Sequence, residues 1–138
     1  MKYTRFFLLI CASLLFIQVA ISQTLSQNEQ DAQTVLTRYF DALSQGDTST
    51  LRSLIGGDLL RKRALLLDNP TYPSHLVEVY RNVGVQFDQF ATRENDTVVV
   101  DVIVTLPTGE KLKQQFLLAK DPGSDNRQFL IHNETAVQ

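Results

Sequence analysis

The hydrophobic pattern of this chain changes its period once, near Val83, and this change constrains the fold more than any other feature. Before Val83, apolar residues recur at spacings of three and four, which marks one face of a helix. After it they alternate with polar residues, as in half-buried strands, and residues 97–106 are the richest in β-branched side chains. Because the helices precede the strands, the pattern predicts an α+β fold with helices packed on a four-stranded antiparallel sheet.

The first helix carries signals at both ends. Ser26 and Glu29 have the spacing of a capping box, and Gly46 is suited to the left-handed residue that ends a helix. The apolar positions between them fall on one helical face: Ala32, Val35, Leu36, Tyr39, Phe40 and Leu43.

Three shorter helices are expected next. Asp47 or Thr48 can cap the first of them, Asp58 can begin the second, and Ser74 can cap the third. Asn69-Pro70 should end the second, because proline removes a donor and restricts the residue before it.

Four strands joined by short connections predict an antiparallel meander. The second strand has one wholly apolar face, which the helices should cover, and a mixed face bearing Val99, Asp101 and Ile103. We expect Asp101 to be solvated and this outer face to pair two copies in a homodimer, with Leu117 adding apolar area. The fourth strand is expected to be short, with Phe129 and Ile131 inward.

The first 22 residues have the three parts of a secretory signal peptide. Lys2 and Arg5 precede a twelve-residue apolar run, and Ala20-Ile21-Ser22 places small residues before Gln23. The run is well short of the roughly 20 apolar residues that span a bilayer, although an uncleaved anchor stays the alternative. The sequence therefore predicts a signal peptide at 1–22 and one domain at 23–138. It predicts export to the periplasm or the extracellular space, with no stable membrane anchor after cleavage.

Charge and composition weigh against nucleic acid, metal and cofactor sites. The chain has 13 basic and 15 acidic residues, so a basic nucleic-acid-binding face is not expected. We interpret Arg61-Lys62-Arg63 as a solvated helix face. His75 and His132 lie in different predicted elements without an acidic partner at ligand spacing, so no metal site is expected. No motif predicts a cofactor.

Two stretches resemble the nuclear transport factor 2-like superfamily. Residues 37–47 are similar to its opening helix, in which aromatic residues run into a Gly-Asp turn and a second helix. Residues 97–121 are similar to its curved sheet, and the resemblance extends from about residue 30 to residue 133. It implies a cone in which helices pack on a strongly bent sheet.

The resemblance also implies a candidate catalytic residue. Members similar to steroid isomerases and dehydratases place a tyrosine of the first helix and carboxylates of the sheet inside the cone, and Tyr39 matches that tyrosine in context. Such a hydroxyl can stabilise an oxyanion, although Tyr39 can equally be a core residue. The chain lacks the strand between the second and third helices on which isomerase-like members carry an aspartate, which leaves Asp68 as a poorly spaced substitute.

Three functions follow from these observations. The favoured one is an exported, non-enzymatic domain that binds a small apolar ligand or a protein partner in the cone. Its expected lining is Tyr39, Phe40, Tyr80 and Phe116. The alternatives are an isomerase- or dehydratase-like enzyme using Tyr39 with a carboxylate, and a structural accessory domain whose cone is filled.

Overall fold

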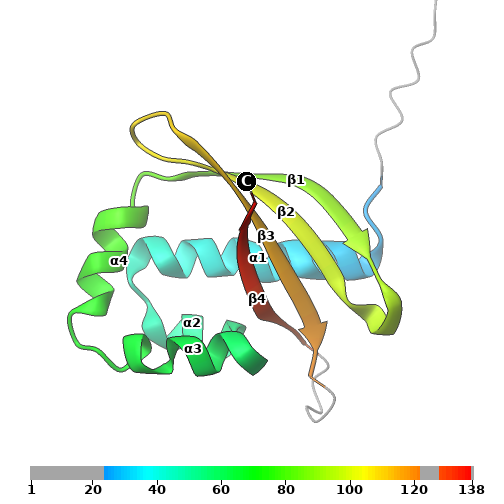
Figure 1. Ribbon diagram of the computed structural model, residues 1–138, viewed down its shortest axis with the longest axis horizontal. Helices are drawn as coiled ribbons and strands as arrows, with labels where there is room; N and C mark the ends of the chain where they lie inside the picture. Colours follow the sequence, from blue (N-terminus) through cyan, green and yellow to red (C-terminus); the bar gives the residue numbers. More distant parts are fainter. Residues whose placement is uncertain (1–23, 122–127, 138) are drawn as a thin grey trace, which may run out of the picture.

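The computed structural model describes residues 24–121 and 128–137, and it shows helices packed on one antiparallel sheet (Figure 1). This confirms the α+β expectation. The predicted signal peptide lies outside the described residues. The elements, in chain order, are α1 (Gln27–Gln45), α2 (Thr48–Leu54), α3 (Gly57–Leu67), α4 (Tyr72–Tyr80), β1 (Gly84–Thr92), the short turn η1 (Glu94–Asp96), β2 (Val98–Thr105), β3 (Lys111–Lys120) and β4 (Phe129–Val137).

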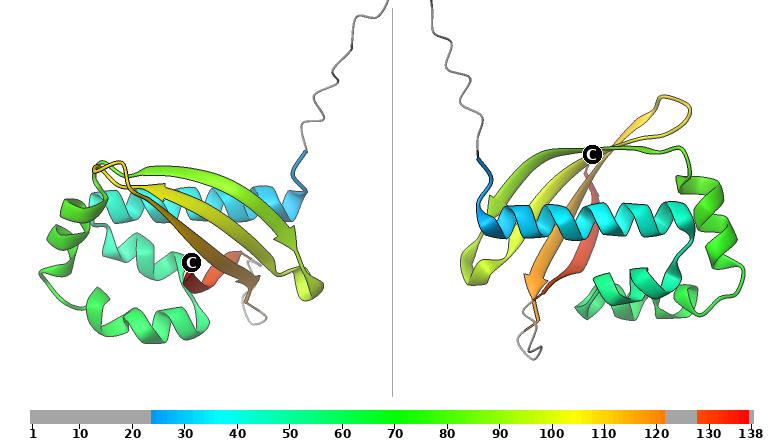
Figure 2. Two further views of the ribbon diagram at one scale, coloured as in Figure 1. Left: turned by 45° about the horizontal axis from the view of Figure 1, so that its top comes forward. Right: turned by 180° about the vertical axis from the view of Figure 1, so that it is seen from behind.

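Helix α1 has both of its predicted ends. The Glu29 backbone N–H donates to Ser26 Oγ at 3.3 Å, and the Ser26 N–H donates to Glu29 Oε2 at 2.9 Å. Gly46 follows the helix with φ of 66°, in the left-handed region. The helix lies across one face of the sheet and buries the predicted apolar stripe against it (Figure 2).

The shorter helices follow the predicted order, with one shifted start. Asp47 caps α2 by accepting from the Thr50 N–H at 3.0 Å. Helix α4 begins at Tyr72, so Ser74 lies inside it and the prediction that Ser74 caps the helix is wrong. Pro73 occupies the first turn, where its missing N–H has no intrahelical partner to lose.

The strands form a meander in the order β1-β2-β3-β4, with every neighbouring pair antiparallel. Each edge strand contains one irregularity: Asp88 is skipped in the β1 register, and His132 is skipped in the β4 register. A bulge bends its strand and increases the local twist, so bulges on both edges are consistent with the curved sheet in Figure 2.

Strand β4 is longer than the sequence predicts, and its bulge changes which residues face the helices. The register steps from Ile131 directly to Asn133, so His132 is an extra residue. If His132 paired as an ordinary strand residue, the inward side would fall to Asn133 and the residues alternating with it. Because His132 is bulged instead, Glu134 pairs with buried Phe116 and takes the inward side, while Asn133 is exposed.

The core lies between α1 and the inner face of the sheet, as expected. Its largest fully buried side chains include Tyr39, Phe116, Phe129, Leu36, Leu43, Leu51, Leu54, Leu118 and Ile131.

The outer face of the sheet is more covered than predicted. Val99 is only 6% exposed, so it does not offer the apolar area expected of it. Asp101 is also not solvated, because its carboxylate accepts from Gln115 Nε2 at 2.9 Å and lies 3.3 Å from Lys113 Nζ. Ile103 remains half-buried, and association through this face stays a prediction.

Among the described residues, no helix has the length and apolar character that a membrane span requires.

Candidate functional site

Aromatic rings fill the interior of the cone. The rings of Tyr39, Phe40 and Phe116 meet edge to face, with centroids 5.6 to 5.9 Å apart. Tyr39 is 1% exposed and Phe116 is fully buried. Three of the four predicted ligand-binding residues, Tyr39, Phe40 and Phe116, therefore lie within packed core.

The Tyr39 hydroxyl joins a three-residue polar cluster that links α1, α3 and β4. It donates to Glu134 Oε2 at 3.1 Å and accepts from Arg63 Nη1 at 2.6 Å. Arg63 Nη2 donates to the same Glu134 oxygen at 2.5 Å. Each member of the cluster thus contacts both of the others.

Burial keeps the Tyr39 hydroxyl of this cluster protonated. Desolvation, followed by the nearby Glu134 carboxylate, raises the pKa of Tyr39 well above its usual value of 10.0. The Arg63 guanidinium lies 6.0 Å from the centre of the Tyr39 ring and favours the phenolate less than burial opposes it. Tyr39 is consequently a neutral hydroxyl that donates a hydrogen bond to the Glu134 carboxylate.

The cluster closes the cone. The side chains of Arg63 and Glu134 are 21% and 14% exposed, which places them at the boundary between core and solvent. A desolvated ion pair is stable only when hydrogen bonds satisfy it, and Tyr39 supplies one from beneath. The arrangement can hold α3 against β4. It also uses the hydroxyl hydrogen of Tyr39 in a hydrogen bond to Glu134.

Sequence reasoning missed two of these three residues. Glu134 reaches the interior only because of the bulge at His132. Arg63 was assigned to a solvated basic face, yet it stands four residues from both Leu59 and Leu67, which are buried. That spacing of four was a usable signal that Arg63 lies on the inner side of α3.

Asp68, the other candidate acid, lies away from Tyr39. It follows the last turn of α3, its side chain is 69% exposed, and it pairs with Arg52 at 2.5 Å. Between α2 and α3 the described chain forms only an isolated bridge, in which Ile55 pairs with Ile131. No acid stands at that position.

Tyr80, the remaining predicted binding residue, and Phe40 line a groove of about 300 Å³ beside the cone, which we call the β1 groove. One wall is a stripe of α1, and the other comes from the end of α4 and the start of β1. Its lining residues are Thr37, Phe40, Asp41, Ser44, Tyr80, Arg81, Val83, Val85 and Phe87.

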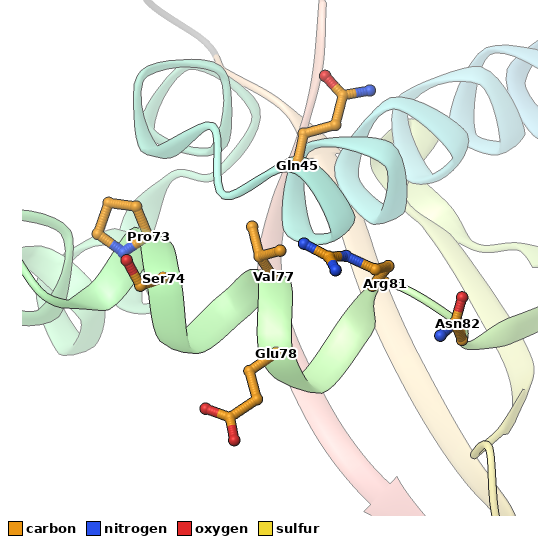
Figure 3. Close-up of a pocket in the computed structure, with 7 residues that line it drawn as sticks. All are labelled: Gln45, Pro73, Ser74, Val77, Glu78, Arg81 and Asn82. Carbon is orange, nitrogen blue, oxygen red and sulfur yellow. The ribbon is translucent and has the colours of Figure 1, made fainter.

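A second, shallower hollow of about 600 Å³ adjoins the β1 groove between α4 and the end of α1 (Figure 3). Arg81 lines both hollows, and Figure 3 shows its side chain directed toward the last turn of α1. A cation is favoured there because helix carbonyls concentrate negative partial charge at the C-terminus. The helices approach closely at this point: a Cβ on Gly46 would lie 2.5 Å from the Pro73 carbonyl oxygen.

The two histidines lie in different elements. His75 is exposed on α4. His132 packs against Gly57, and its Nε2 is buried without a hydrogen-bond partner among the described residues. In the parts of the chain that the structure describes, no group of three histidine, cysteine or acidic side chains is placed to hold a metal.

Comparison with known proteins establishes the fold. Neither a protein-family model nor a curated protein sequence matches the chain. A nuclear transport factor 2-like protein of unknown function from Shewanella baltica shares 12% identity, with a TM-score of 0.55 over 83% of this chain and 98% of that one. A Campylobacter jejuni protein provisionally named an NTF2-like transpeptidase shares 16% identity, with a TM-score of 0.48 over 73% of this chain and 97% of that one. The chain has the nuclear transport factor 2-like fold, which confirms the fold that the sequence resemblance implies.

Proposed function

We propose that this domain of nuclear transport factor 2-like fold is an exported, non-enzymatic binding domain that takes an apolar group into the β1 groove. The observation that carries the proposal is the open groove that Tyr80 lines together with Phe40. Phe40 is only 7% exposed and forms the floor between this groove and the core, in which Tyr39 and Phe116 are packed.

The size and lining of the β1 groove support a small apolar group. About 300 Å³ lies at the lower end of the range for ligand sites. Its apolar wall includes Val83, Val85 and Phe87, which alternate along β1 and its approach, and Val85 is 36% exposed. Thr37 and Ser44 offer hydroxyls from α1 that can orient a bound group.

A binding assay with a paired control tests the proposal. An environment-sensitive naphthalene dye should bind the purified domain, and Val85→Glu should abolish the signal by placing a charge in the groove. Val79→Glu is the matched control, because Val79 is 39% exposed on α4 and does not line the groove. Equal binding by the two variants would place the apolar site elsewhere and defeat the proposal.

The approach of Glu134 to Tyr39 favours a second candidate, an isomerase- or dehydratase-like enzyme. It supplies the carboxylate that the sequence did not locate near Tyr39. Catalysis would require the Arg63–Glu134 pair to separate, since the hydroxyl, guanidinium and carboxylate engage one another in the structure.

Mass spectrometry of small molecules extracted from the purified domain separates these functions. A retained apolar ligand that is also present in the Tyr39→Phe variant supports binding without catalysis. A turnover product formed by the wild type and lost in that variant supports the enzyme. Absence of both leaves a structural accessory domain.

Export is tested on protein from the native host. Intact-mass measurement should find a chain that begins near Gln23, outside the cytoplasm. A full-length cytoplasmic product would contradict this part of the proposal.

A further inference from the structure

Strand β1 forms an edge of the sheet. It pairs with β2 on one side, and no other strand pairs with it among the described residues. The backbone hydrogen bonds that join turns, loops and caps in the described part of the chain involve no group of residues 84–87. Alternate N–H and C=O groups of this stretch therefore face outward, as a template for a further strand.

The β1 groove runs along this edge. Val83, Val85 and Phe87 contribute every second residue to it. Helix α1 passes across the face of the sheet that includes β1 (Figure 2). A strand added to β1 would lie about 4.8 Å from it, with every second side chain on the groove side. The period of such an added strand thus matches that of the groove wall.

The bulge limits how much of the edge can be used. Asp88 is the residue skipped in the register between β1 and β2, so the strand bends after Phe87. The regular part of the edge, residues 84–87, is also the part that borders the groove. About four residues of a partner can pair there.

Two exposed charges in the groove wall can attract a partner of complementary charge. Arg81 and Asp41 line the groove, and neither side chain forms an ion pair or hydrogen bond within the described residues. A partner that carries one acidic and one basic side chain beside its apolar residues would neutralise both. A neutral hydrocarbon would contact the apolar wall alone and use neither charge.

We infer that the occupant of the β1 groove is an extended polypeptide segment that pairs with the edge of β1 as a fifth strand. The segment presents alternate apolar side chains to Val85 and Phe87, with an acid for Arg81 and a base for Asp41. Main-chain pairing supplies affinity in this mode of recognition, and the groove selects the side chains. The inference rests on the proposed function, because it assigns the partner class for the same groove.

A host peptide with chemical controls tests the pairing. The probe is a synthetic hexapeptide of alternating valine and threonine flanked by one lysine and one glutamate, prepared in both sequence directions. Its two control sets carry N-methyl groups on alternate amides, which remove backbone donors and keep every side chain. We expect one direction to bind with a Kd of about 1 mM or lower, and one methylation set to weaken it about tenfold.

Hydrogen exchange and substitution locate the contact. Peptide binding should slow exchange about tenfold at the outward amides of residues 84–87 and leave those of β3 unchanged. Val85→Lys should abolish binding, whereas Val79→Lys should retain it.

The remaining outcomes distinguish the inference from the proposed function. Dye binding without peptide protection of β1 would overturn the inference and leave the groove as a small-molecule site. Equal binding by the parent and both methylated sets would also overturn it. Loss of both dye and peptide binding would remove both proposals. A dimer that protects the β1 edge without peptide would replace the inferred partner with a second copy of the chain.

Discussion

The hydroxyl of Tyr39 donates a hydrogen bond to Glu134, a residue 95 positions later in the chain. The contact joins the first helix to the last strand, and Arg63 completes it from α3. The closure of the cone therefore depends on three segments that are distant in sequence.

Removing the Glu134 carboxylate should cost more stability than removing an exposed one. Glu134→Gln leaves the largely buried Arg63 without its anion, and we expect a loss of about 1–3 kcal/mol in the free energy of unfolding. Asp68→Asn breaks the exposed pair with Arg52 and should cost less than about 1 kcal/mol. Urea denaturation measures both, and equal losses would contradict the desolvated cluster.

Stability should fall in alkaline solution because of Tyr39. Burial raises the pKa of Tyr39 in the folded chain above its usual value of 10.0, so the folded state holds this proton after the unfolded state has lost it. The free energy of unfolding then decreases as pH rises beyond about 10. The wild type should lose up to about 1.4 kcal/mol per pH unit more than Tyr39→Phe in this range. Parallel pH profiles for the two proteins would refute the assignment.

Truncating the inner face of α1 tests the packing. Leu36 is fully buried, and Leu36→Ala should destabilise the protein by about 2–5 kcal/mol. Leu65, which is 86% exposed on α3, serves as the comparison, and Leu65→Ala should change stability by less than about 0.5 kcal/mol. An unchanged denaturation midpoint for Leu36→Ala would show that the buried face is misassigned.

Alanine substitutions at two glycines distinguish the cost of backbone strain from the cost of a steric clash. Gly46 and Gly109 both have positive φ, of 66° and 87°, so alanine is strained at each. A Cβ at Gly109 meets nothing within 4 Å, whereas one at Gly46 meets the backbone of Pro73. Gly109→Ala should cost about 1–2 kcal/mol, and Gly46→Ala should cost more because α4 must move. Thermal unfolding can rank the stability losses of the two variants. A larger loss for Gly109→Ala than for Gly46→Ala would contradict the close approach of Gly46 to Pro73.

Association through the outer sheet face is tested by sedimentation. We expect a dimer that Ile103→Lys weakens, because Ile103 is half-buried on that face. Leu112→Lys is the control, since Leu112 pairs with Val104 and so shares the inner face, near the start of β3. Monomer alone at high concentration would remove the prediction.

The regular parts of the fold follow from local sequence. The apolar stripe of α1, its capping box and Gly46 each act within one or two turns, so the sequence alone predicts that helix. The strands follow for the same reason, because alternation along residues 98–105 reports a half-buried strand without knowledge of its partners.

The candidate site could be predicted only in part, because its geometry depends on distant pairing. Tyr39 was identified from its helix, but the acid beside it is set by register rather than by local pattern. Asp101 illustrates the same limit: only the neighbouring strand, with Lys113 and Gln115, shows that its carboxylate is covered.

Because β4 contains one extra residue, the side of the sheet that each following residue faces depends on its distance from this bulge. Deletion of His132 would leave Asn133 opposite Leu117 and Glu134 opposite Phe116 in a regular strand, so Glu134 would keep its inward position one residue closer to Ile131. A gap-free alignment with a relative that has a regular last strand would therefore match Glu134 to an outward position. Searches for the Tyr39–Glu134 pair in other sequences need to allow an insertion of one residue at this point, since a fixed spacing would discard true counterparts.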